Sequence, residues 1–357
     1  MMHVRRIRTG DCFTHRAVVM RCVPKQLISG RQLPGAMTKQ RADRIIPNSN
    51  SNCATSTIST MIVFIWAKAT GPFTIWGWQR PVIQSIRRAR RFADLYVDEQ
   101  AGNYDPQNRI IRSPFHGSGG PRHHGELELV KRALDPVYYP GGVARGHAQR
   151  ANLHPRVVDL EEDWHEDPQR CEEICRLFDE IVLCGDIPDN LACTGLMTNA
   201  YLHTGDEKYR QCVLDYSQSW LERIHHNDGI IPDNVGLSGK IGERRGGQWW
   251  GGWYGWNSRN SARNALLAAT VVAECCLLLA GDSGYLELIR SQIEMLVDRA
   301  ITREDGQLLV PTRMMPDGWT DFQPLHLQWL GRLYHASMHE HDRALIERLK
   351  EAMGCCV

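Results

Sequence analysis

The sequence lacks the patterns that identify many metal, redox and nucleotide sites. Its 12 cysteines form no CxxC pair and no Cys/His zinc spacing, which favours buried reduced thiols over a zinc or redox motif. The histidine-rich segment Ser113–Glu128 lacks the helical HExxH order. Its HGSGGP stretch is not followed by the Gly-Lys-Ser/Thr of a phosphate loop. We therefore expect no metal site and no cofactor.

The chain also lacks a strong charge of one sign and a long apolar run in its N-terminal part. The net charge is +1, with 42% hydrophobic and 23% charged residues, so composition indicates neither a nucleic-acid partner nor a wholly disordered protein. The strongly apolar run Met61–Ala67 is shorter than the ~20 residues that a membrane-spanning helix needs. We expect no stable membrane span.

Charge divides the chain into two parts. Residues 1–75 contain 11 Lys and Arg against 2 Asp and Glu, which leaves 31 against 39 for residues 76–357. The first part has no sustained hydrophobic period, so we interpret it as a disordered or irregular basic arm that precedes a domain at 76–357. Residues 37–69 faintly resemble a secretory signal, and they alternatively form a strand or helix on the main body. Both a cytoplasmic and an exported location stay open.

Helical hairpins dominate the second part. Ala200–Pro232 parallels Leu277–Pro311: each has an apolar helix that ends in Thr/Ala-Gly-Asp, and then a second helix that begins near a tyrosine. The glycine is a C-terminal stop and the aspartate an N-cap. A further helix pair is predicted at about 325–339 and 341–353, and upstream helices at 80–99, 168–183 and 190–203.

The segment Gly246–Asn264 is the most unusual stretch of the chain. It interleaves glycines with Trp249, Trp250, Trp253, Tyr254 and Trp256. This lacks the aliphatic neighbours of a core segment and predicts a loop whose flat rings suit sugars. The alternative is an aromatic plug at the end of a helical core.

Three features of the chain carry a family resemblance: the tandem TGD-x-x-Y hairpins, the loops DGIIPDNVG and DGQLLVPTRMMPDGWTD, and the GGWYGW loop. In these features the chain resembles the six-hairpin α/α toroid superfamily of glycosidases and polysaccharide lyases. The likeness covers roughly residues 160–349. It implies an all-α toroid with a sugar cleft at one mouth and a poly- or oligosaccharide, often acidic, as substrate. Fold likeness alone does not settle the chemistry.

Candidate catalytic residues come from two Ile-Pro-Asp-Asn copies, at 187–190 and 231–234. A helix follows the first copy, so Asp189 and Asn190 are explained as caps, whereas Asp233 has no helix to cap and is the preferred catalytic carboxylate. Hydrolysis needs a second carboxylate, for which the candidates are Asp189, Glu243, Asp317 and Asp321. Elimination instead needs a base, Tyr254 or His326, and groups that neutralise a substrate carboxylate, Asn234, Arg244 or Arg245.

The sequence thus predicts a carbohydrate-active protein that hydrolyses or β-eliminates a polysaccharide at an aromatic cleft. The substrate-binding set is Trp249, Trp250, Trp253, Trp256, Trp319, Asn234, Arg244 and Arg245. Alternatives are a non-catalytic carbohydrate-binding or scaffold protein, and a small-molecule isomerase or cyclase with an enclosed site. About nine helices are too few for a ring of six hairpins, so we expect an incomplete toroid that self-associates.

Overall fold

A computed structural model of the chain describes residues 83–98, 102–117, 120–134, 164–253, 255–257, 261–325 and 327–352. All of them belong to one compact unit, Ala54–Val357. The basic arm at 1–75 with its signal-like segment, Tyr254 and His326 lie outside the described residues. The proposed domain boundary at 75/76 therefore stays a prediction.

The first helical hairpin has the predicted turn. Helix α9 (Thr194–Thr204) ends at Gly205, which adopts a left-handed conformation with φ of 68°. Glycine takes this conformation without the steric cost that a Cβ would bring. Asp206 then caps α10 (Glu207–His226) by accepting a hydrogen bond from the N–H of Lys208. The Thr-Gly-Asp signal is confirmed here.

The second and third hairpins follow the same plan with local differences. Helix α11 (Ser261–Ala280) ends at Gly281, and Asp282 caps a short 3-10 turn, η3 (Ser283–Leu286), that leads into α12 (Glu287–Asp298). Helices α13 (Leu327–Ser337) and α14 (Glu340–Ala352) form the third pair. Upstream, α4 (Ile83–Val97) packs against α9.

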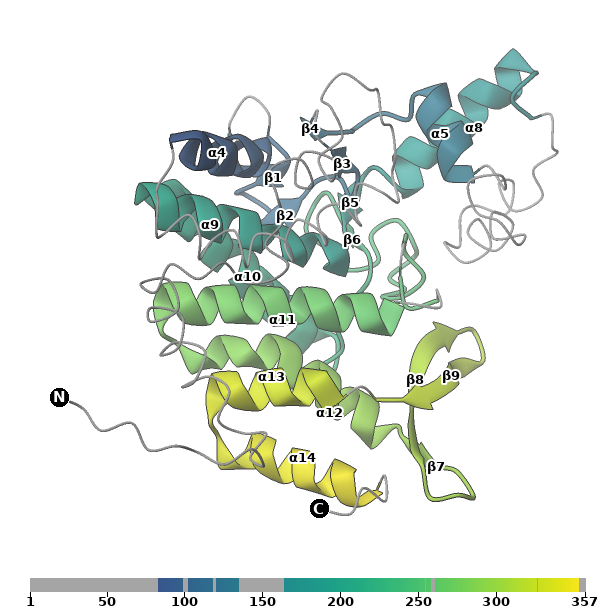
Figure 1. Ribbon diagram of the computed structural model, residues 1–357. Coiled ribbons are helices and arrows are strands. Elements are labelled where there is room, and N and C mark those ends of the chain that lie inside the picture. The colour runs from purple at the N-terminus through teal and green to yellow at the C-terminus, as the bar shows by residue number, and fades with distance from the viewer. Residues whose placement is uncertain are drawn as a thin grey trace, which may run out of the picture. The chain divides into compact units, whose positions relative to one another are not determined.

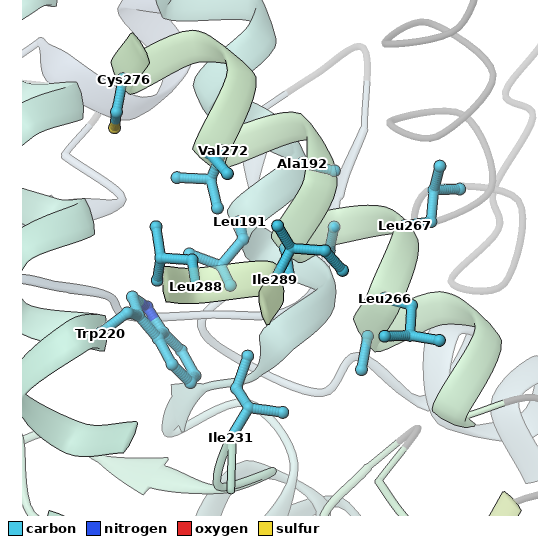
Figure 2. Packing of buried hydrophobic residues seen from close by; sticks show 14 of the residues in the cluster. Leu191, Ala192, Trp220, Ile231, Leu266, Leu267, Val272, Cys276, Leu288 and Ile289 are labelled. Atoms are coloured by element: carbon cyan, nitrogen blue, oxygen red, sulfur yellow. The ribbon is translucent and has the colours of Figure 1, made fainter. Parts of the chain in front are cut away.

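Helix α11 is the centre of the main core. It contacts α9, α10, α12 and α13 (Figure 1). Figure 2 shows side chains of α11 such as Val272 facing Leu191, Leu288 and Ile289, with Trp220 nearby. Its segment Ala262–Ala280 is the one stretch among the described residues that is long and apolar enough to cross a membrane, but 56% of that window is buried inside the protein. Apolar residues all round a helix are typical of a buried core position.

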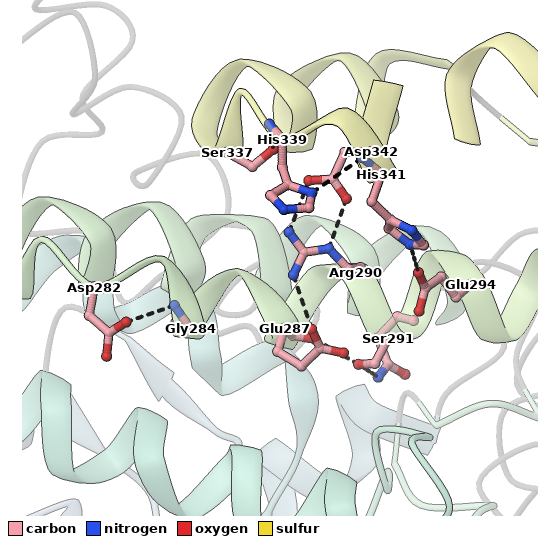
Figure 3. A network of polar contacts seen from close by, with 11 residues as sticks. Asp282, Gly284, Glu287, Arg290, Ser291, Glu294, Ser337, His339, His341 and Asp342 are labelled. Atoms are coloured by element: carbon pink, nitrogen blue, oxygen red, sulfur yellow. Dashed lines mark hydrogen bonds and ion pairs between the residues drawn. The ribbon is translucent and has the colours of Figure 1, made fainter. Parts of the chain in front are cut away.

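Helices α12 and α14 are joined by polar contacts (Figure 3). Arg290 donates from Nε and Nη2 to the two carboxylate oxygens of Asp342, at 2.8 and 2.9 Å. Burial would raise the pKa of Asp342, but these hydrogen bonds outweigh it and hold the pKa below its ordinary value. His341 contacts Glu294, and the ring of His339 accepts from the N–H of His341. His341 thus adds a second contact between α14 and α12.

A second, smaller core lies around α8 (Pro168–Ile181) and α5 (Leu127–Leu134), which pack against each other. Asp167 caps α8 through the N–H of Gln169, as the WHED segment before Pro168 predicts. The buried residues of this cluster include Phe115, Phe178 and Trp253.

The expectation of an all-α toroid is wrong. The structure is about 56% helical with 13% strand and is a mixed α/β fold. Three antiparallel pairs are very short: β1 (Tyr104–Asp105) with β2 (Ile110–Ile111), β3 (His116–Gly117) with β4 (Gly120–Pro121), and β5 (Gly185–Asp186) with β6 (Val235–Gly236). The fourth sheet has the order β7 (Ile301–Thr302), β8 (Leu308–Met315), β9 (Gly318–Pro324).

The prediction of a loop at residues 303–323 is wrong. Strands β8 and β9 instead form a hairpin in which Met315 pairs with Gly318. Gly318 has φ of 109°, which an L side chain rarely adopts. The Asp-Gly pair between two segments rich in apolar and β-branched residues is a hairpin signal.

Candidate functional site

The two Ile-Pro-Asp-Asn copies lie at one short sheet. Strand β5 ends directly before Ile187 and β6 begins directly after Asn234, and in this pair Asp186 lies opposite Val235. Gly185 lies opposite Gly236, where a Cβ on Gly185 would overlap the carbonyl of Val235. The copies are 44 positions apart in sequence and are brought together by this ladder.

Asp233 is buried and organises the tryptophan-rich loop. Its Oδ1 accepts from the N–H of Gly252 at 2.8 Å, and its Oδ2 accepts from the N–H groups of Gly251 and Trp256 at 2.8 and 2.6 Å. Asn234 Nδ2 donates a fourth hydrogen bond at 3.1 Å. Burial raises the pKa of Asp233, and these four donors only partly oppose that rise. Both carboxylate oxygens are thus occupied by the protein's own backbone.

The glycines of this loop allow the chain to approach Asp233. A Cβ on Gly255 would overlap the Asp233 carboxylate, and one on Gly252 would overlap the Asp233 carbonyl. The loop also returns to the second copy through the Trp256 indole, which donates to Ile231 O at 2.8 Å. The described residues of this loop therefore lie beside residues 231–234.

The tryptophans of the loop fall into two groups. Trp256 is 1% exposed in the main core and meets Trp319 with ring centroids 5.4 Å apart. Trp253 is buried in the smaller core, with the rings of Phe115 and Phe178 at 5.6 and 5.7 Å. Neither ring has a free face for a sugar, so the aromatic-plug alternative describes these two.

The remaining rings, Trp249, Trp250 and Trp319, are partly buried. Trp249 and Trp319 lie with centroids 6.1 Å apart, and Arg299 lies over the Trp319 ring at 5.9 Å. Trp319 is carried by β9 and Trp249 by the loop, so two separate segments contribute to this aromatic cluster.

Asp189 has a very different environment from Asp233. It is 3% exposed in the first turn of the 3-10 helix η2 (Pro188–Cys193), and its Oδ2 finds no hydrogen-bond partner among the described residues. Burial raises its pKa to about 7. The capping interpretation is wrong, because the N-cap of η2 is Ile187 and no side chain caps it. An unsatisfied buried carboxyl is costly and is typical of functional sites.

A buried chain of hydrogen bonds runs beside Asp189. Tyr96 OH contacts His116 Nδ1 at 3.0 Å, and His116 Nε2 contacts Asn190 Oδ1 at 3.1 Å. Asn190 Nδ2 donates to Asp186 Oδ1 at 2.9 Å, and Tyr216 OH donates to the same oxygen at 3.1 Å. Because Asn190 Oδ1 can only accept, His116 carries its proton on Nε2 and Tyr96 donates to Nδ1.

Burial disfavours the charged forms of the titratable groups along this chain. Burial lowers the pKa of His116 to about 4, so the imidazole is neutral at neutral pH. Burial also raises the pKa of Asp186 to about 6, against the hydrogen bond from the N–H of Ile111 and the positive charge of Arg223. The chain holds Asn190, and with it the turn that carries Asp189.

A family model described as a domain of unknown function, DUF8034, matches residues 78–310. The chain belongs to this family. The match includes both Ile-Pro-Asp-Asn copies, the tryptophan-rich loop and the hydrogen-bond chain, whereas α13 and α14 follow it. Searches of curated proteins and of solved structures find no match.

In this DUF8034 protein, Asn234, Arg244 and Arg245 line one cavity with Gly252 and Trp253. Its volume is about 30 Å³, which accommodates a water molecule but not a sugar ring. Burial lowers the pKa of Arg245, and the nearby Asp233 charge opposes this. These residues are therefore grouped as expected, around a cavity that is too small for a sugar ring.

The other predicted carboxylates are engaged or exposed. Glu243 accepts from the N–H and hydroxyl of Ser238, Asp321 accepts from Arg313, and Asp317 is exposed.

Sequence reasoning missed Asp186 in the DUF8034 domain. A signal existed: Gly-Asp-Ile-Pro-Asp-Asn at 185–190 repeats as Gly-Ile-Ile-Pro-Asp-Asn at 229–234, so a charge replaces an isoleucine at a buried position.

Proposed function

We propose that this protein cleaves a glycosidic bond in a poly- or oligosaccharide, with Asp189 as the general acid. The observation that carries the proposal is a buried carboxyl whose Oδ2 has no hydrogen-bond partner among the described residues and whose pKa is about 7. At that pKa a large fraction of the carboxyl is protonated at neutral pH. It can then donate its proton to the leaving-group oxygen.

Asp189 takes this role in place of Asp233. The Asp233 carboxylate is surrounded by four N–H donors, which favour its ionised form and leave no lone pair directed at a substrate. Asp233 instead keeps the tryptophan-rich loop in place next to the first copy. Asp233 therefore contributes to activity by positioning this loop.

The carbohydrate part of the proposal is supported by the partly buried rings of Trp249, Trp250 and Trp319. Indole faces that retain some exposure stack on the apolar face of a sugar ring. Arg244 and Arg245 line the cavity beside this loop and suit an acidic substrate. Hydrolysis is preferred to elimination because Asp189 can supply the proton donor that hydrolysis needs.

An isomerase that acts on an enclosed small molecule is the second candidate. The 3% exposure of Asp189 favours it, because a polysaccharide needs an open groove. The same carboxyl would then move a proton within one small substrate.

A screen of neutral and uronic polysaccharides tests the proposal, with reducing ends and unsaturated products read separately. We expect new reducing ends without unsaturated products, and their loss in Asp189→Asn. The matched control is Asp298→Asn, an exposed residue at the end of α12, which keeps full activity. Unsaturated products would indicate elimination, and full activity of Asp189→Asn would overturn the assignment. Sugar binding without any turnover would favour the non-catalytic alternative.

A further inference from the structure

A second and larger cavity lies away from Asp189. It has a volume of about 420 Å³ and opens to solvent between the turn that follows β1, helix α10 and the loop that follows β6. Its walls include Gln107, Asn108, Arg109, Glu222, His226 and Lys240. Small-molecule sites usually fall between about 300 and 1,000 Å³, so this cavity has the size of a metabolite site.

The wall of the cavity is built around a buried cation. Arg223 is 7% exposed. Its guanidinium donates only to neutral groups: the carbonyls of Asn108, Arg109 and Gly239 and the hydroxyl of Ser219. No described carboxylate forms an ion pair with it. A buried charge without a contacting counterion leaves a positive potential in the adjacent space.

The walls of the cavity fit closely against each other, so the cavity is part of the folded structure. Gly239 has φ of 80°, and a Cβ there would lie 3.1 Å from the carbonyl oxygen of Asn108. Since Arg223 bonds to both the Asn108 and the Gly239 carbonyl, it joins the turn to the loop across α10. The walls are thus held by a cation that forms no ion pair with a described carboxylate, although the charges of Asp186 and Glu222 act on it from nearby.

The groups at the rim add to the positive potential. Among the described residues, Glu222 is the only carboxylate that lines the cavity, and Arg109 engages both of its oxygens, at 3.2 and 2.5 Å. Lys240 is exposed and forms no ion pair with the described residues. His226 donates Nδ1–H to the Glu222 carbonyl at 2.6 Å, which leaves Nε2 as its second polar atom. The lining therefore carries three permanent cations, Arg109, Arg223 and Lys240, against one anion.

We propose that this cavity binds a small molecule that carries a phosphate or carboxylate group. Lys240 supplies a mobile charge for the anionic group, and the amide side chains of Gln107 and Asn108 supply polar contacts to the rest of the ligand. The size of the cavity excludes a polymer. The proposal is independent of glycosidic bond cleavage at Asp189.

Isothermal titration calorimetry on the full chain tests this with four probes: inorganic phosphate, glucose 1-phosphate, glucuronate and neutral glucose. We expect saturable binding of at least one anion, weakened by added salt, and none of glucose. The phosphate and carboxylate arms distinguish the two kinds of anionic group. Lys240→Gln should weaken the binding about tenfold, as expected for loss of one charge-assisted contact.

The control variant is Arg348→Gln, which removes an exposed cation of α14 outside the cavity and should leave the affinity unchanged. Both positions are exposed, so neither substitution endangers the fold. Absence of binding by all three anions, equal affinity for glucose, or an equal loss in both variants would overturn the proposal.

Discussion

Asp186 pairs with Val235 across the β5–β6 ladder, and this single pairing places the two Ile-Pro-Asp-Asn copies beside each other. The copies have the same four residues but opposite environments. Asp233 accepts four hydrogen bonds, whereas Oδ2 of Asp189 has no partner among the described residues. Their different neighbours, and not their identical local sequence, separate a hydrogen-bonded carboxylate from one with an unpaired oxygen.

Asp233→Asn should destabilise the protein by about 2–3 kcal/mol, because an amide group would face backbone N–H donors that need an acceptor. Urea unfolding followed by tryptophan fluorescence measures the change, with Asp298→Asn as the isosteric control at an exposed site. A catalytic role of Asp233, as the sequence predicts, would instead have this variant lose turnover and keep binding. Wild-type stability in Asp233→Asn would restore that interpretation.

Gly255→Ala should cost about 1–3 kcal/mol, since the added methyl group overlaps the Asp233 carboxylate. Gly331→Ala is the matched substitution, because Gly331 lies in α13 with no atom near its missing Cβ. There alanine should be neutral or stabilise by up to about 1 kcal/mol. Thermal melts of the two variants compare them directly, and equal effects would contradict the close approach.

Asp189→Asn should become more stable than the wild type as pH rises. The pKa of Asp189 is about 7 in the folded protein against 3.8 ordinarily, so the folded state binds the proton more tightly. Burial of the Asp189 carboxyl thus lowers the free energy of unfolding little below pH ~4 and progressively more up to pH ~7, where the loss is on the order of 4 kcal/mol. Urea unfolding from pH 4 to 8 measures the difference between variant and wild type. A difference independent of pH would contradict the raised pKa.

Trp256→Ala should destabilise the protein by about 3–5 kcal/mol, because it removes a buried ring and its hydrogen bond to Ile231 O. Trp250→Ala, at a partly buried position, should cost less than half as much. Binding of oligosaccharides should respond in the reverse order. A stable Trp256→Ala protein with weakened sugar binding would instead favour stacking by Trp256.

The helical hairpins could be predicted because their signals are local. A glycine that ends a helix and an aspartate that caps the next one act within a few residues, and Gly205 with Asp206 does what the pattern indicates. The short strands could not be predicted in the same way. A two-residue strand such as β5 exists only because β6, far along the chain, presents its backbone to it.

The same difference between local and long-range signals applies to the candidate site. The sequence by itself determined the helical hairpins and the helix ends at Gly205 and Gly281. Only the tertiary structure decided that Trp253 and Trp256 are buried, that Asp233 is enclosed by N–H groups, and that Asp189 keeps a pKa of about 7. Burial and hydrogen-bond partners come from segments distant in the chain, and they set whether a carboxylate is a scaffold or an acid.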